Sequence, residues 1–168
     1  MRGVVGYSIQ FLIIVALQVL ILNNVELLGY MNPYLYLIFL LILPADIGRN
    51  SLLIIAFFLG LSIDLFENSG GLHTSATLLI AFLRPTLFKL IAGPSSSELE
   101  RFNIKTLGTG RFLLLAAITV LIHHFWLFML ESFSLKDLLQ VFKRTFFSSL
   151  FTLLLIYLTQ LLVYRKEE

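Results

Sequence analysis

The sequence predicts an all-α integral membrane protein with about six transmembrane helices. The first observation is composition: 58% of the residues are hydrophobic and 13% are charged, whereas a soluble domain carries about 25% charged residues. The second is arrangement, because the apolar residues gather in six runs separated by short polar or charged stretches. The length of 168 residues fits one transmembrane domain, 1–168, and a net charge of +2 does not indicate a nucleic-acid partner.

The six apolar runs define the predicted spans. A hydrocarbon core requires roughly 20 helical residues. Four runs meet that length, but the second, bounded by Pro33 and Pro44, and the third are short. The second run crosses if its helix continues past Pro44, and the alternative is one re-entrant hairpin made of runs two and three. We place the spans at about 4–22, 31–48, 51–66, 72–91, 112–130 and 145–164.

The basic residues predict the orientation. The first run follows Arg2 and lacks a small-residue cleavage site, so we expect a retained helix rather than a signal peptide. With six crossings and a cytoplasmic N-terminus, three basic residues face outside: Lys136, Lys143 and Arg144. Positive charge collects on the cytoplasmic side, so both termini are predicted there. The basic residues on that side are Arg2, Arg49, Lys89, Arg101, Lys105, Arg111, Arg165 and Lys166.

The stretch before the last span has the pattern of a surface helix. Ser134 and Asp137 have the spacing of a capping box. Apolar residues then recur at helical spacing as far as Phe146, with charged residues between them. We expect an amphipathic helix on the external membrane surface, with docking to a partner helix as the alternative.

Polar residues inside the spans are candidate functional residues because the membrane makes them costly. Asp64 lies near the external end of the third span. It is either a proton-handling group or an acceptor for backbone amides of the turn 67–71. Gly70 and Gly71 supply the positive φ that a tight helical hairpin needs. His73 follows at the depth of Asp64, so a contact between the two is expected.

Five further polar residues lie within the predicted spans. Arg84 lies too deep for an ion pair with Asp64, and we expect it to snorkel to the cytoplasmic headgroups. His123 and His124 are adjacent, so their side chains diverge around the helix and do not suit one metal ion; we expect one to face the bundle. Gln18 and Gln160 are predicted to make interhelical polar contacts.

Catalytic signatures are missing from the sequence. It has no cysteine, no phosphate loop, no HExxH and no Ser/His/Asp spacing. We therefore expect no enzyme activity, metal or cofactor. An intramembrane enzyme that uses His73, His123 or His124 is kept as an alternative.

The segments Gly60-Leu61-Ser62-Ile63-Asp64-Leu65-Phe66 and Gly70-Gly71-Leu72-His73-Thr74-Ser75-Ala76 resemble the MreD family of rod-shape proteins. The family pattern is a helix ending in G-L-x-x-D-L, a glycine turn, and G-L-H-x-x-A opening the next helix. The likeness covers about residues 10–90. Two features depart from it: many relatives carry an acidic residue at the position of Tyr34, and Arg84-Pro85 is typical of only a subset. The carried-over motif residues are Gly60, Asp64, Gly70, Gly71, Leu72 and His73.

The resemblance implies a non-enzymatic scaffold in the bacterial cytoplasmic (inner) membrane. Such proteins bind MreC, a single-span protein, and are associated with MreB filaments and the RodA–transpeptidase pair that builds side-wall peptidoglycan. The family is also similar in fold to the six-helix substrate-binding subunits of ECF vitamin transporters. The alternative function is therefore small-molecule binding, with a polar cavity bounded by Asp64, Glu67 and His73.

Overall fold

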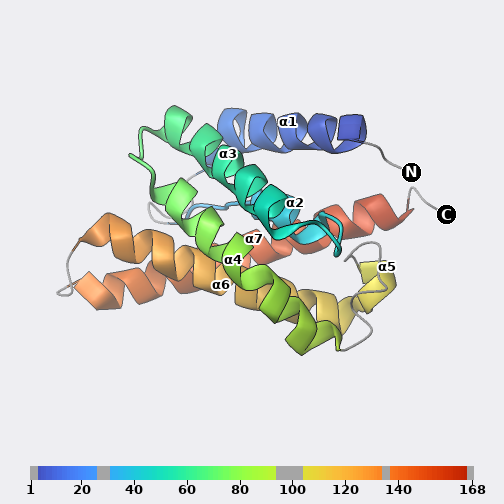
Figure 1. Ribbon diagram of the computed structural model, residues 1–168. Coiled ribbons are helices and arrows are strands. Elements are labelled where there is room, and N and C mark those ends of the chain that lie inside the picture. Colours follow the sequence, from blue (N-terminus) through green and yellow to red (C-terminus); the bar gives the residue numbers. More distant parts are fainter. Residues whose placement is uncertain (1–3, 26–30, 94–103, 134–136, 166–168) are drawn as a thin grey trace.

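The structure is a computed structural model that describes residues 4–25, 31–93, 104–133 and 137–165. In this part of the chain every regular element is a helix (Figure 1). The elements are α1 (Val4–Leu20), the 3₁₀ turn η1 (Leu22–Asn24), α2 (Leu37–Ile42), α3 (Arg49–Glu67), α4 (Leu72–Ala92), α5 (Ile104–Leu107), α6 (Thr109–Ser132) and α7 (Leu138–Arg165).

Five helical segments in the described residues are long and apolar enough to cross a membrane. They run over Val4–Asn24, Arg49–Glu67, Leu72–Ile91, Thr109–Ser132 and Leu138–Val163. Five of the six predicted spans fall on these segments. The chain is therefore an all-helical, multi-pass membrane protein, as its composition predicted.

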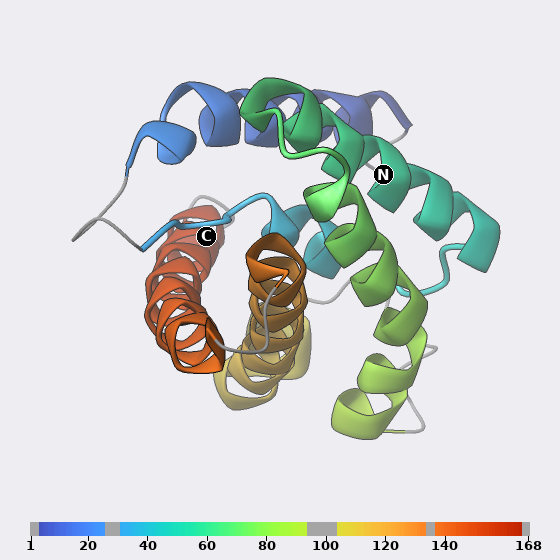
Figure 2. The same ribbon diagram turned by 90° about the vertical axis from the view of Figure 1, so that its left-hand side faces the viewer.

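The long helices form two hairpins. Helices α3 and α4 pack against each other, as do α6 and α7, and α4 also packs on α6. Helix α1 lies on the outer side of α3 (Figures 1 and 2). Figure 2 looks along α6 and α7 and shows the segment before α3 in the middle of this arrangement.

The second predicted span is not a spanning helix. The chain is non-helical from Met31 to Tyr36, forms only the six-residue α2, and is again non-helical from Leu43 to Gly48. Pro33 precedes this helix and Pro44 follows it, as expected of residues that do not continue helices. Irregular backbone is tolerated at membrane depth only where protein covers it, and every residue from Pro33 to Leu41 is buried. In Figure 1 this segment leads back from the far end of α1 to the start of α3.

The predicted surface helix does not exist as a separate element. Its described residues, from Leu138 onward, belong to α7, a continuous helix of 28 residues that also contains the last span. Leu139, Phe142 and Phe146 are exposed, whereas Val141 is buried. The apolar face is therefore continuous with the outer face of the span. Ser134, half of the predicted capping box, lies outside the described residues.

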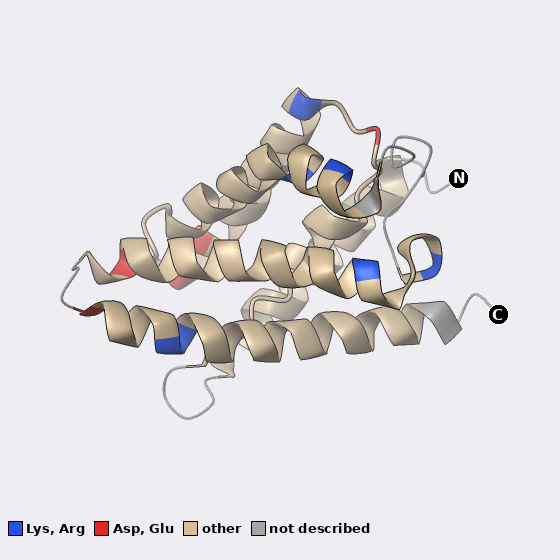
Figure 3. Cartoon of the chain, turned by 90° about the horizontal axis from the view of Figure 1, so that it is seen from below, with Lys and Arg blue, Asp and Glu red and all other residues tan. Residues whose placement is uncertain are grey.

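Charged residues are divided between the two ends of the described molecule. In Figure 3 most Lys and Arg ribbons lie toward the end where α1 begins and α7 ends, and most acidic ribbons lie at the opposite end. The arrangement agrees with the predicted sidedness. Which end faces the cytoplasm stays a prediction from the charge distribution.

Candidate functional site: a polar core around a non-helical segment

Asp64 joins the end of α3 to the start of α4. Its Oδ1 accepts hydrogen bonds from Ser69 Oγ (2.5 Å) and His73 N (3.0 Å), and its Oδ2 accepts from Thr74 N (2.8 Å) and Thr74 Oγ1 (2.5 Å). The first amides of a helix have no intrahelical partner, and Gly71 at the N-cap has no side chain to supply one. Asp64 therefore caps α4 from the preceding helix. The expected contact with His73 is confirmed, but the bonded amides belong to α4 rather than to the turn.

The glycines of the motif have two different functions. Gly70 and Gly71 have φ of +63° and +96°, which confirms the predicted left-handed turn, and Leu72 then opens α4. At Gly60 an added Cβ would lie only 2.7 Å from Thr74 N and would also overlap Thr77 Oγ1. At Gly60 the backbones of α3 and α4 are therefore in close contact, which brings Asp64 within reach of α4.

The Tyr36 hydroxyl connects two buried histidines. It lies 2.9 Å from His73 Nδ1 and 2.8 Å from His123 Nε2, and His73 Nε2 lies 2.7 Å from Glu67 Oε2. A carboxylate only accepts, so His73 donates from Nε2. In the neutral ring Nδ1 then accepts from the Tyr36 hydroxyl, whose oxygen accepts from His123 Nε2. The remaining His123 nitrogen, Nδ1, is buried without a partner and carries a lone pair rather than a stranded proton.

His124 also faces the interior, so the expectation that only one of the adjacent histidines would do so is wrong. Its Nδ1 donates to the Val120 carbonyl (2.8 Å), and its Nε2 accepts from Thr152 Oγ1 (3.2 Å). Both rings are accommodated because the Tyr34 ring contacts each of them, with centroids 6.2 Å from His123 and 5.3 Å from His124. The non-helical segment thus fills the angle between the two side chains.

Side chains from α1 and α7 satisfy the backbone of the non-helical segment. Gln18 Oε1 accepts from Tyr36 N (3.3 Å), and Gln18 Nε2 donates to the Pro33 carbonyl (2.9 Å). From α7, Thr152 Oγ1 accepts from Tyr34 N (3.0 Å), and Ser148 Oγ accepts from Asn32 N (3.1 Å). The predicted contact of Gln18 is therefore made to this segment rather than to a neighbouring helix. Gln160 is buried in α7.

Arg84 does not snorkel as predicted. Only 3% of its surface is exposed, and its Nη2 donates to the carbonyls of Leu43 (2.6 Å) and Pro44 (3.2 Å). The guanidinium carbon lies 4.2 Å from the centroid of the Phe88 ring. The guanidinium is held inward because the carbonyl groups of the non-helical chain after α2 accept its hydrogen bonds.

Several residues of the polar core were not predicted, among them Tyr34, Tyr36, Ser148 and Thr152. Both tyrosines lie in an apolar run that the sequence predicts to be helical, and backbone amides inside a helix need no side-chain acceptors. Ser148 and Thr152 have a signal in the sequence, because residues four apart share one face of a helix. Two small hydroxyl residues at that spacing in an apolar helix mark a polar stripe.

The described residues contain no group of three or more His, Cys, Asp or Glu side chains that could hold a metal ion. The polar side chains of the site instead hydrogen-bond to one another and to buried backbone. Fold and site together define a helical multi-pass membrane protein with an irregular central segment. No family model, curated protein or solved structure matches this chain.

Proposed function

We propose that this chain is a non-enzymatic membrane scaffold of the bacterial cell-elongation machinery. In this role it binds an MreC-like single-span protein and helps couple MreB filaments to peptidoglycan synthesis by the RodA–transpeptidase pair. The supporting observation is that the MreD-like motif residues act as one unit. Gly60 brings α3 and α4 together, Asp64 caps α4, and Gly70 and Gly71 make the turn.

The hydrogen bonds of the buried polar side chains also favour a scaffold function. Asp64 is occupied by four hydrogen bonds, and His73 is held between Glu67 and Tyr36. Groups engaged in this way fix a shape. A rigid hairpin with an apolar exterior is suited to presenting helix faces to other membrane proteins.

Depletion of the protein in a rod-shaped bacterium that carries it tests the proposal, with cell width as the readout. Loss of a scaffold of the elongation machinery is expected to round the cells. Unchanged rods after complete depletion would contradict the proposal. Loss of uptake of a nutrient, with normal shape, would instead favour the ECF-type transport subunit.

Partner binding provides the second test. Gly71→Leu forces a side chain into a backbone with φ of +96° and is expected to reduce co-purification with the MreC-like protein. Gly110→Leu is the matched control, because an added Cβ there meets nothing within 4 Å. Both variants must first show a cooperative thermal transition. Retention of the partner by folded Gly71→Leu would count against this function of the motif.

The transport alternative depends on a polar cavity bounded by Asp64, Glu67 and His73. In the structure the Glu67 carboxylate bonds to the His73 ring, and the Asp64 carboxylate accepts from the backbone amides of His73 and Thr74 at the start of α4. The geometry therefore gives that cavity no support. A pocket does exist, but it lies near the opposite end of α3 and α4.

A further inference from the structure

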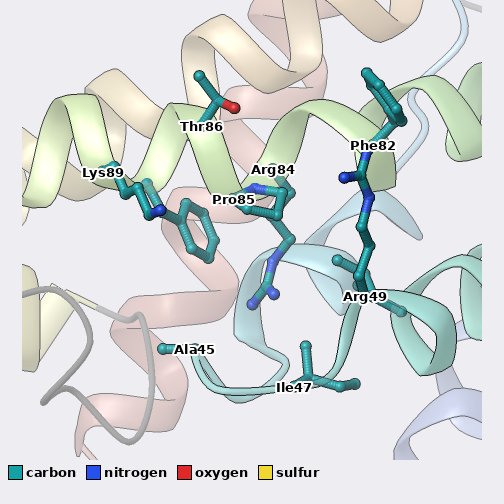
Figure 4. A pocket seen from close by; sticks show the side chains of 10 residues that line it. Ala45, Ile47, Arg49, Phe82, Arg84, Pro85, Thr86 and Lys89 are labelled. Atoms are coloured by element: carbon teal, nitrogen blue, oxygen red, sulfur yellow. The ribbon is translucent and has the colours of Figure 1, made fainter.

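A basic pocket opens between the start of α3 and the second half of α4. Its volume is about 400 Å³, within the range of small-ligand sites. Arg49, Arg84 and Lys89 contribute positive charge, and Phe82 and Phe88 contribute apolar surface. Figure 4 shows the cations entering from two sides, Arg49 from α3 and Arg84 and Lys89 from α4.

Among the described residues, no carboxylate pairs with the cations of this pocket. Arg84 has the strongest need for an anionic partner. Among the described residues its Nε is buried without a partner, and its contacts are neutral carbonyls and the Phe88 ring. A buried charge is costly unless it is paired. The unbalanced charge therefore points to an anionic ligand.

The start of α3 adds to this electrostatic preference. Its N-cap, Gly48, supplies no side-chain hydrogen bond, so the first amides of the helix are free to face an anion. Arg49 stacks on Phe82, with its guanidinium carbon 4.6 Å from the ring centroid. Stacking on a ring face leaves the N–H groups at the guanidinium edge available for a phosphate.

We propose that this pocket binds the phosphate headgroup of an anionic phospholipid. The location favours a lipid, because the pocket lies between two helices that are long and apolar enough to span. It also lies at the end predicted to be cytoplasmic, where basic pockets between membrane helices receive anionic headgroups. The exposed ring of Phe82 provides apolar surface for an acyl chain. This site is independent of the proposed scaffold function.

Native mass spectrometry of the full chain in detergent tests the site. Short-chain phosphatidylglycerol and phosphatidylcholine are titrated separately, and bound lipid is counted. We expect phosphatidylglycerol to be retained preferentially. Arg49→Gln and Lys89→Gln should each weaken its binding about fivefold, the effect of removing one basic residue near a lipid surface. Arg84→Met should weaken it at least as much.

Arg111→Gln is the matched control, because Arg111 is exposed, is predicted on the same membrane side, and does not line the pocket. An equal loss with this variant would mean general surface attraction and would overturn the site. Equal retention of both lipids would also overturn it. Inorganic phosphate binding as tightly as phosphatidylglycerol would overturn the assignment to a lipid. If Arg84→Met does not fold, the Arg49 and Lys89 variants still decide the question.

Discussion

The hairpin of α3 and α4 buries one carboxylate and one guanidinium, and the two differ in how completely the fold supplies their hydrogen-bond partners. Asp64, near one end, accepts four hydrogen bonds from the chain itself. Arg84, near the other end, donates to two carbonyls, and its Nε remains without a partner. The carboxylate of Asp64 is fully satisfied inside the fold, whereas the guanidinium of Arg84 has no carboxylate partner among the described residues.

The difference separates a group that builds the structure from one that is available to a ligand. A buried hydrogen-bonded charge that loses its partners is strongly destabilising. Removing a charge that was never balanced costs much less, because its desolvation penalty is removed with it. Substitutions of Asp64 and Arg84 test this contrast directly, and substitutions of Gly60 and Tyr36 test the packing and the hydrogen bonds around Asp64 and His73. The expected losses of stability decrease from Asp64 to Arg84.

Asp64→Ala should have the largest effect. The substitution leaves the first amides of α4 and the hydroxyls of Ser69 and Thr74 without their acceptor, and we expect a loss of about 3 kcal/mol. Reversible unfolding in mixed micelles would measure it. Asp46→Ala is the control, because Asp46 is exposed and should change stability by less than about 0.5 kcal/mol. Equal effects would show that Asp64 is not a cap.

Gly60→Ala should destabilise the hairpin by about 2 kcal/mol, because a Cβ here overlaps the backbone of Thr74 and forces the helices apart. The control is Gly110→Ala, at a helical position in open space. There alanine should stabilise by about 0.5 kcal/mol, as expected for an exposed helix. The same assay applies, and a tolerated Gly60→Ala would mean that α3 and α4 are not in backbone contact.

Tyr36→Phe should cost about 1.5 kcal/mol, because it removes the hydroxyl that connects His73 and His123. A double-mutant cycle with His123→Phe measures whether the two effects are coupled. Tyr157→Phe is the control and should be nearly neutral, because the hydroxyl of Tyr157 in α7 makes no hydrogen bond within the described part of the chain. Additive losses would show that the network is not cooperative.

Arg84→Met should have the smallest effect, about 1 kcal/mol, from the carbonyls of Leu43 and Pro44 that lose a donor. Added lipid provides a second way to distinguish Arg84 from Asp64. Phosphatidylglycerol should raise the unfolding temperature of the wild type through binding to the folded state and should raise that of Arg84→Met less. A loss as large as that of Asp64→Ala would erase the distinction between the two charges.

Contacts of the site between residues close in sequence were predicted, whereas contacts between residues far apart in sequence were not. The turn at Gly70 and Gly71 and the contact of Asp64 with His73 were predicted, because their partners lie within ten residues along the chain. Tyr36 was not predicted, because its partners His73 and His123 lie 37 and 87 residues away. No local pattern records such pairings, since they depend on how the helices pack.

The prediction for Arg84 was wrong for a related reason, because its hydrogen-bond partners also lie far away in the sequence. A long basic side chain in a membrane helix ordinarily extends toward the headgroups, and nothing near it in sequence contradicts that expectation. The structure differs because the chain around Pro44 is non-helical and its carbonyls lie beside α4. A partner for Arg84 could be recognised only once the helix in the second apolar run was known to end before Pro44.

By itself, the sequence determined that this chain is a helical multi-pass membrane protein and where its long helices run. Hydropathy and helix-breaking residues are local properties, and the membrane allows few alternatives to a helix. Only the tertiary structure decided that the run between Pro33 and Pro44 forms just the six-residue helix α2 and that the chain on both sides of it is irregular. Its backbone requires the side chains of Gln18, Ser148 and Thr152, and these come together only when the bundle closes around it.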